Sequence, residues 1–444
     1  MKSAVILGGG LSGLVVADRL QEKGFQVIVV EKDPSCGGMC QSKVWTTNDG
    51  HRVLYDLGPH KFAPCSDVAK DYFLRYVRNP IEVPITGAVY LGGKILSYPV
   101  KVTEILKNFP LKGIRCGVDF MLKFLNSEDG TYGGYIRRRL GTYTYNFVFR
   151  DYANKIWGDP DGLDWELART RFVTPKLSDM IIGALTGKNT LTFKSFMYPN
   201  ICMGVFARAI ELKIKENGGK ILLNSNASSY DGKRLRLNVM GKEVTIDDPL
   251  IVSTIEPREL ASVMALDSKP LSALKYRSIN MFYFLIKGER PNNTWLFYPE
   301  KSIKFNRTSV NFHPKAAGDG KFLVCVEVTG SKKDISNFTR SDLERCLCDI
   351  YSISKTDIVD QWNYFLRNAY PVYHVGFKED IKTVLRMLES HGRVFCIGRH
   401  ACHNYNNMDH TIIEALDLAE IVGDGGDVIE WGKKRESYDW RIID

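Results

Sequence analysis

The segment SAVILGGGLSGLVVADRLQEKGFQVIVVE, residues 3–31, decides the fold of this chain. An apolar run is followed by a glycine-rich turn, an amphipathic helical pattern and a second apolar run that ends at Glu31. Gly8, Gly10 and Gly13 fit the pattern G-x-G-x-x-G, which lets the backbone approach a pyrophosphate at a helix N-terminus. Glu31 lies where a carboxylate accepts hydrogen bonds from ribose hydroxyls. The segment therefore predicts a Rossmann-like dinucleotide-binding unit.

A second segment, GRHACHNYNNMDHTI at residues 398–412, follows the buried apolar run Val394–Ile397. Its residues 408–411 are expected to open a helix, whose first turn offers free N–H groups to an electron-rich ligand. Together with the glycine-rich turn, this segment predicts a flavin site. Because no second dinucleotide-binding repeat occurs, we expect one tightly held FAD, and any NAD(P)H would bind transiently as a reductant.

Composition narrows the class of protein. With 444 residues, 44% hydrophobic and 25% charged, the chain is expected to form two or three units of a globular protein. No apolar run reaches the ~18 residues needed to span a bilayer, and no secretory signal opens the chain. A cytoplasmic protein with reduced thiols is therefore expected, and the ten cysteines lack the spacing of a metal site.

The net charge of +9 is compatible with nucleic acid, an anionic surface or an anionic small substrate. Short basic clusters such as Arg137-Arg138-Arg139 are more often solvated faces than binding sites. No long basic stripe with interleaved aromatic residues appears, so nucleic acid is not expected as a partner. Positive charge around a diphosphate pocket accounts for the excess more economically.

The order of patterns predicts an α/β fold, with an FAD-binding Rossmann-like domain, a helical insertion and an antiparallel β-sheet substrate domain. The segment Asn368–Tyr373 is expected to be a loop. The predicted segments are residues 1–70, 196–262 and 388–444 for the FAD-binding domain, 71–100 and 263–387 for the substrate sheet, and 101–195 for the helical insertion.

The chain resembles the UDP-galactopyranose mutases, within the amine-oxidase and protoporphyrinogen-oxidase superfamily of FAD enzymes. In that family Gly-Arg, a Tyr six residues after the Arg, and Met-Asp before a Thr-Ile helix recur, and Arg399, Tyr405, Met408 and Asp409 occupy those places. The segment Trp165–Pro175 resembles a further motif of the family, Trp…Arg-x-x-x-Pro. Elsewhere Gly58-Pro59-His60 stands where the family has Gly-Gly-His.

This resemblance implies residue roles. Arg171 and Arg307 would bind the two phosphates of the substrate, Tyr370 and Tyr405 would donate hydroxyls to them, and His60 would face the flavin. Trp157, Tyr98 and Tyr298 are the expected substrate contacts. The expected cofactor contacts are Gly8, Gly10, Leu11, Ser12, Gly13, Glu31, Lys32, Gly37, Gly38, Met39, Gly58, His60, Gly398, Arg399, Met408, Asp409 and Thr411.

Structural roles are the alternative for each group. The arginines could be solvated, the tyrosines and Trp157 could be satisfied core residues, and His60 could pack against a ring without taking part in chemistry.

The implied activity is a redox-neutral interconversion of the pyranose and furanose forms of a nucleoside-diphosphate sugar, with a UDP-sugar favoured, through an adduct between the sugar and N5 of the reduced flavin. The rival enzyme class is an FAD oxidase or desaturase of the same superfamily, which needs an apolar substrate tunnel and no paired arginines. A third interpretation is a flavin-binding protein without turnover. A homo-oligomer is compatible with all three.

Overall fold

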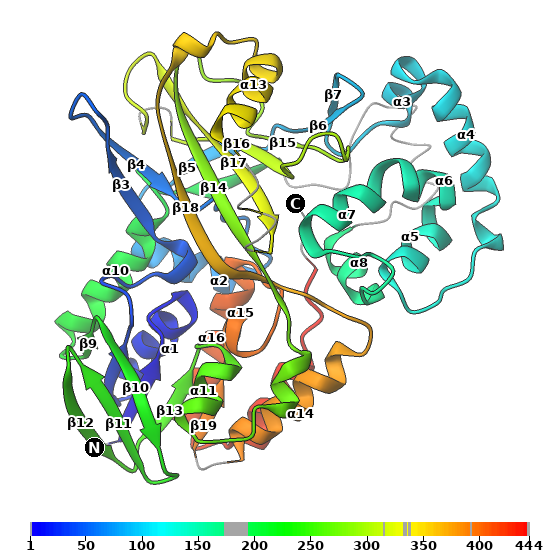
Figure 1. The fold of residues 1–444 in the computed structure, drawn as a ribbon. Coiled ribbons are helices and arrows are strands. Elements are labelled where there is room, and N and C mark those ends of the chain that lie inside the picture. Colours follow the sequence, from blue (N-terminus) through cyan, green and yellow to red (C-terminus); the bar gives the residue numbers. More distant parts are fainter. Residues whose placement is uncertain are drawn as a thin grey trace.

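The computed structural model describes residues 2–172, 194–313, 316–331, 335, 339–390 and 393–441. A parallel sheet, a large mixed sheet and a group of helices form the three main parts of the molecule (Figure 1). The predicted α/β class, with a Rossmann-like unit and antiparallel sheets, is confirmed. Pro175, which belongs to the Trp…Pro motif, lies outside the described residues.

The parallel sheet has five strands in the order β19-β13-β1-β2-β9. Its central strand β1 pairs in parallel with β2 on one side and with β13 on the other, so distant parts of the chain meet here. The five strands are β1 (Ser3–Leu7), β2 (Gln26–Val30), β9 (Lys220–Leu222), β13 (Leu250–Ser253) and β19 (Val394–Cys396).

Both faces of this sheet are covered. Because side chains alternate along a strand, Ala4 and Ile6 join the core under the helices, whereas Val5 and Leu7 join the core on the opposite face. The helices of the first face are α1 (Leu11–Glu22), α2 (Asp67–Tyr76), α10 (Gly204–Glu216), α16 (Met408–Gly423) and α17 (Val428–Glu436). The other face packs on α11 (Pro257–Val263), α14 (Phe377–Glu389) and the small sheet of β10 (Ser225–Tyr230), β11 (Arg234–Val239) and β12 (Lys242–Asp247).

The large sheet has seven strands in the order β18-β14-β17-β16-β15-β6-β7. All neighbours are antiparallel except β15 and β6. One face packs on α13 (Arg340–Tyr351), and the other on the hairpin of β3 (Ser42–Thr46) and β4 (Arg52–Asp56). The strands are β6 (Gly87–Leu91), β7 (Lys94–Ser97), β14 (Tyr276–Lys287), β15 (Trp295–Phe297), β16 (Arg307–Val310), β17 (Lys321–Gly330) and β18 (Ile358–Pro371).

The prediction of a loop over Asn368–Tyr373 is wrong for residues 368–371 and holds only for the last two residues. Strand β18 continues to Pro371, and Tyr370 still pairs with Arg277 of β14. The register shifts near Asn368, which has a positive φ of 54°, as in a β-bulge. The long neighbouring strand β14 supplies the backbone partners that a local pattern does not reveal.

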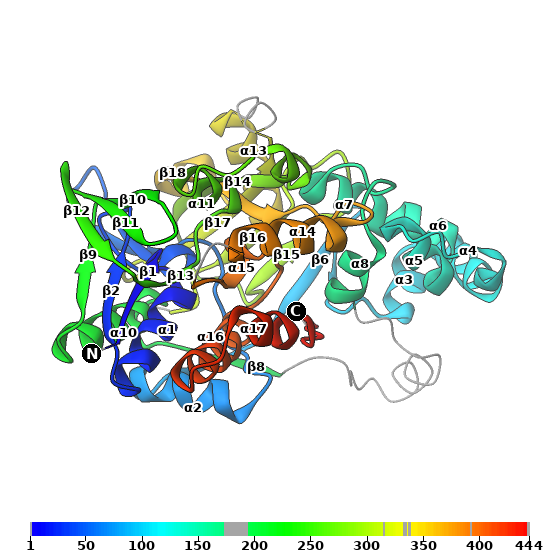
Figure 2. The ribbon, with the colours of Figure 1, turned by 90° about the horizontal axis from the view of Figure 1, so that it is seen from below.

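A group of helices forms a lobe beside the large sheet, at the right of Figures 1 and 2. Among the described residues, no helix combines the length and the apolar composition needed to cross a membrane. The helices of the lobe are α3 (Val102–Asn108), α4 (Pro110–Met121), α5 (Tyr132–Leu140), α6 (Thr142–Thr144), α7 (Arg150–Trp157) and α8 (Trp165–Arg171).

Candidate functional site

A cavity of about 250 Å³ lies where the glycine-rich turn, the large sheet and the segment after β19 meet. It collects most of the predicted site residues, although they come from all parts of the sequence. The predicted residues that line it are Gly10, Leu11, Ser12, Gly37, Gly38, Met39, Gly58, His60, Arg171, Arg307, Tyr370, Gly398, Arg399, Tyr405, Met408, Asp409 and Thr411.

The glycines of the turn are needed for different structural reasons. A Cβ on Gly10 would meet only the Cα of Gly38, at 3.9 Å, so the missing side chain leaves open space beside the cavity. A Cβ on Gly13 would lie 2.1 Å from the carbonyl oxygen of Gly8, so this glycine lets α1 pack closely on the turn. Gly8 has a φ of 102°, which a residue with a side chain rarely adopts. Gly10 is therefore the position where a ligand can approach the backbone.

Glu31 lies beside the turn but outside the cavity lining. Its carboxylate accepts hydrogen bonds from the backbone N–H groups of Gly9, at 2.7 Å, and Asp33, at 2.9 Å. Burial raises the pKa of this carboxyl, while the two hydrogen bonds oppose the rise. Lys32, by contrast, points to solvent and pairs with Glu259 at 3.6 Å.

Three arginines surround the two tyrosines of the cavity. Arg171 ends α8, and its guanidinium lies 5.1 Å from the centre of the Tyr405 ring. Arg399, in the short helix α15 (Gly398–Ala401), lies 5.5 Å from the same ring. The rings of Tyr405 and Tyr370 stack, with centres 5.6 Å apart and planes 5° apart. Cationic groups and phenol hydroxyls thus converge on one place, as binding of an anion requires.

Arg307, at the start of β16, is the third of these arginines and is held by a buried carboxylate. Its Nε and Nη2 donate to the two carboxylate oxygens of Glu327, at 2.8 and 2.9 Å. The two residues are direct partners across β16 and β17, and Glu327 is 1% exposed. A guanidinium has five N–H donors, so three remain for other acceptors. Glu327 therefore fixes the orientation of Arg307 without using up its donors.

Tyr405 is held in place by further hydrogen bonds. Its backbone N–H donates to the hydroxyl of Tyr373 at 2.7 Å, and that hydroxyl donates to Asn404 at 3.1 Å. The indole N–H of Trp157 donates to the hydroxyl of Tyr405 at 3.3 Å. Trp157 is buried outside the cavity lining, so its contact with the cavity runs through Tyr405.

His60 is a neutral imidazole at neutral pH. Burial, followed by the nearby Arg399, lowers its pKa to about 4. Its Nε2 atom is buried without a hydrogen-bond partner among the described residues, and the residue lines the cavity. A bound ligand can therefore satisfy this atom.

Two predicted substrate contacts do not reach the cavity. Tyr298 is fully buried in the core of the large sheet, and its hydroxyl is hydrogen-bonded to Thr308 at 2.9 Å. Tyr98 packs its ring on Phe297, with centres 5.0 Å apart. Neither tyrosine belongs to the cavity lining.

The structure adds residues that the sequence patterns did not indicate. Glu327, Lys61 and His400 line the cavity. Glu327 directly follows the apolar run Phe322–Val326 within β17, and a carboxylate buried at such a place needs a partner. This single acidic residue in an otherwise apolar stretch was the signal in the sequence that could have indicated a site residue.

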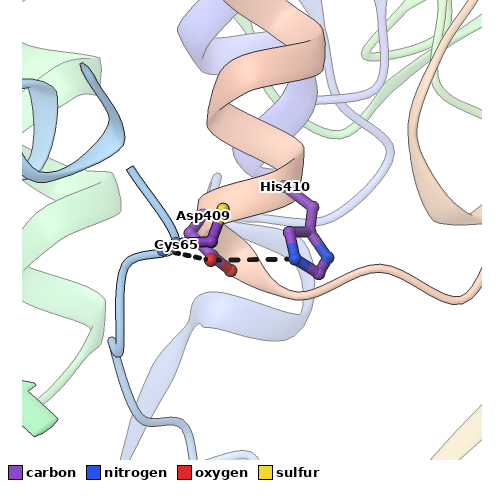
Figure 3. Close-up of side chains that lie close together, drawn as sticks. All are labelled: Cys65, Asp409 and His410. Atoms are coloured by element: carbon purple, nitrogen blue, oxygen red, sulfur yellow. Dashed lines mark hydrogen bonds and ion pairs between the residues drawn. The ribbon is translucent and has the colours of Figure 1, made fainter. Parts of the chain in front are cut away.

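Three possible metal ligands lie close together at the start of α16 (Figure 3), and one of them, Asp409, lines the cavity. Cys65, Asp409 and His410 each place one donor atom within 4.8 Å of the others. Asp409 already accepts a hydrogen bond from the backbone N–H of Cys65, at 2.9 Å. His410 accepts one from the backbone N–H of Asn407, at 3.3 Å, as part of the helix cap. The first bond joins the loop at Cys65 to the start of α16 and the second caps that helix, so both have a structural role.

Comparison with known families identifies the dinucleotide-binding unit. Residues 6–76 match the family description NAD(P)-binding Rossmann-like domain, which covers the glycine-rich turn and Glu31. The overall fold is similar to that of a putative protoporphyrinogen oxidase from Exiguobacterium, with a TM-score of 0.70 and 14% identity over 95% of this chain and 98% of that chain.

The resemblance to UDP-galactopyranose mutase is confirmed for the fold. The solved structure of reduced UDP-galactopyranose mutase is similar with a TM-score of 0.82 and 20% identity, over 95% of each chain. A probable UDP-galactopyranose mutase from Klebsiella pneumoniae is 26% identical over 167 residues, which are 35% of this chain and 41% of that protein. Prolycopene isomerase 2 from an Oncidium hybrid cultivar is 27% identical over 259 residues, which are 52% of this chain and 44% of that protein. The matched regions thus span less than half the length of these two relatives.

Proposed function

We propose that this protein is a flavin-dependent mutase, which interconverts the pyranose and furanose forms of a nucleoside-diphosphate sugar, with a UDP-sugar favoured. The observation that carries the proposal is the meeting of Arg171, Arg307 and Arg399 around two stacked tyrosines in one cavity with the dinucleotide turn. A diphosphate needs guanidinium groups to replace its lost water.

FAD fits the residues present. Gly10 leaves open space where a pyrophosphate would approach, and the first turn of α1 offers backbone N–H groups to it. Glu31 is preorganised beside the turn, and the unpartnered Nε2 of His60 lines the same cavity. A reduced flavin bound there would supply a nucleophilic nitrogen for covalent catalysis at the sugar.

The remaining groups of the cavity bind and orient the substrate. Arg171 and Arg307 come from the helical lobe and the large sheet, so together they can hold a diphosphate from two sides. Tyr370 and Tyr405 stay protonated at neutral pH, because burial raises the pKa of each hydroxyl, and they serve as hydrogen-bond donors. Neutral His60 adds no positive charge to the cavity.

The rival proposal is an FAD oxidase or desaturase acting on an apolar substrate. The cavity argues against it, since the N–H donors of Arg307 that Glu327 does not occupy would lose water and gain no acceptor from such a substrate. The third possibility is a protein that binds flavin without catalysing a reaction. It would have the same cavity but would form no product.

The deciding experiment incubates the flavin-loaded protein, reduced with dithionite under anaerobic conditions, with a panel of nucleotide sugars. The expected result is conversion of a UDP-hexose to an isomer of equal mass, separated by anion-exchange chromatography, with no reductant consumed per turnover. The oxidised protein is the matched control and should be inactive. Steady hydrogen peroxide production in air from an apolar substrate, with no sugar isomer formed, would favour the oxidase instead.

A further inference from the structure

Helix α4 and the residues after it expose an apolar stripe. Leu111, Ile114, Val118 and Met121 follow one another at spacings of three and four, so they share one face of the helix. They are 83%, 59%, 56% and 69% exposed. Leu122, Phe124 and Leu125 continue the exposed apolar surface, as do Val102 and Leu106 of α3. Contiguous apolar surface of this kind marks an interaction site rather than scattered exposure.

Five basic residues lie close to the stripe in sequence, and none has an acidic partner among the described residues. Among the described residues, no ion pair involves Lys107, Lys112, Arg115, Lys123 or Arg138. Lys112 lies over the ring of Phe147, at 4.6 Å, and Arg115 over that of Tyr143, at 4.3 Å.

The carboxylates close to the stripe are already engaged. Asp119 accepts from the backbone N–H groups of Tyr143 and Thr144, and Glu104 accepts from Ser97. Glu128 and Asp129 pair with Arg139 and Arg137. Asp119 and Glu104 keep their charge, but the five cations without acidic partners outnumber them, so the segment that carries the stripe is apolar and net positive.

We propose that α4, with α3 and residues 122–125, is a docking surface for an anionic lipid membrane. An amphipathic helix with exposed Leu, Ile, Met and Phe, and with Lys and Arg beside them, is suited to lie in the interface of a bilayer. Anionic headgroups would neutralise the unpaired cations while the apolar side chains enter the acyl boundary. Figures 1 and 2 both place α4 at the outer edge of the molecule, where a flat surface can reach it.

The charges favour a membrane over a second copy of the chain. In a two-fold symmetric dimer the same surface meets itself, so the net positive charge of this segment would face the same net charge on the other copy. An anionic bilayer removes that repulsion. This inference does not depend on the reaction that the cavity performs.

Vesicle flotation of the full-length, flavin-loaded protein tests the proposal. The vesicles contain phosphatidylcholine with or without phosphatidylglycerol. Wild type should float with the anionic vesicles and much less with the neutral ones, and added salt should weaken the binding. The triple variant Leu111→Ser, Ile114→Ser, Val118→Ser should bind about tenfold more weakly or worse, because its apolar area is lost. The charge variant Lys107→Glu, Lys112→Glu should lose a similar factor.

A matched control replaces three exposed apolar residues on other faces, in the variant Val68→Ser, Met240→Ser, Ile429→Ser, whose positions are 59%, 77% and 64% exposed. It should bind as wild type does. Equal vesicle binding by the stripe variant and wild type would overturn the proposal. The proposal would also be overturned if wild type does not bind vesicles but forms a dimer that the stripe variant cannot form. That result would assign the surface to a second copy of the chain. Failure of all vesicle binding by a monomeric wild type would overturn it as well, in favour of an acidic protein partner.

Discussion

Arg307 and Glu327 face each other across β16 and β17 and form a two-pronged ion pair inside the candidate site. The pair is a consequence of strand register, since direct opposition brings the two side chains to one face of the sheet. The pair places the guanidinium of Arg307 in a buried cavity, together with the carboxylate of Glu327 that stabilises its charge there.

Removal of Glu327 should destabilise the protein more than removal of both partners. Glu327→Ala leaves a largely buried guanidinium uncompensated, and such changes cost about 3–5 kcal/mol of unfolding free energy. The free energy of unfolding of the double variant Arg307→Met, Glu327→Leu should be much closer to that of wild type. Urea denaturation of the flavin-free forms measures both, and a double variant less stable than Glu327→Ala would contradict the assignment.

The arginines should matter for the diphosphate rather than for the flavin. A hydrogen bond to a charged group contributes ~1.5–3 kcal/mol. Arg171→Ala and Arg307→Ala should therefore each weaken UDP binding to the reduced protein, and lower kcat/KM, roughly 10- to 100-fold. Lysine at either position should restore only part of the loss.

Arg345→Ala, on the exposed face of α13, is the matched control for those two variants. It should leave UDP titrations and flavin content unchanged. Wild-type UDP affinity in both Arg171→Ala and Arg307→Ala would remove the diphosphate from the proposal.

Gly10→Val should give a folded but colourless protein. The new side chain has room against the protein, since the nearest neighbour of its Cβ is the Cα of Gly38 at 3.9 Å, but it fills the space beside the cavity. Visible absorbance per protein measures flavin content, and circular dichroism measures folding. Full flavin occupancy in this variant would show that the dinucleotide does not follow the turn.

Stability should fall in mild acid partly because of His60. The pKa of its imidazole is about 4 in the folded protein against 6.5 as the ordinary value. Between pH 6.5 and about 4, His60 is protonated in the unfolded chain but not in the folded chain. The contribution of neutral His60 to the free energy of unfolding is therefore complete above pH 6.5 and is lost as the pH falls. At ~1.4 kcal/mol per pKa unit, it amounts to roughly 3 kcal/mol. Thermal melts of His60→Gln should show a shallower decline over this range, and parallel curves would refute the assignment.

Local patterns predicted the parts of the fold that are local in origin. The unit from Ser3 to Glu31 forms as expected, because its strand, turn and helix signals are adjacent in sequence. The helix at Met408 was likewise predictable, since its N-terminal residues follow a strand and a polar segment.

Features that depend on register could not be predicted in this way. The partnership of Arg307 with Glu327 requires knowledge of which strands pair and at which residue. Tyr298 was expected at the substrate but lies in the core, because the chain after β15 directs its ring to the other face of the sheet. The contact of Cys65 with Asp409 joins residues that are far apart in sequence.

The order of strands in the parallel sheet also sets a condition on how the chain folds. Strand β1 ends at Leu7, whereas its neighbour β13 begins at Leu250 and the outer strand β19 ends at Cys396. During synthesis, one edge of β1 therefore stays unpaired until the chain as far as Ser253 has been made. Such distant pairing slows folding and leaves a strand edge open to aggregation. Refolding from denaturant should accordingly be slow, with a yield that falls as protein concentration rises.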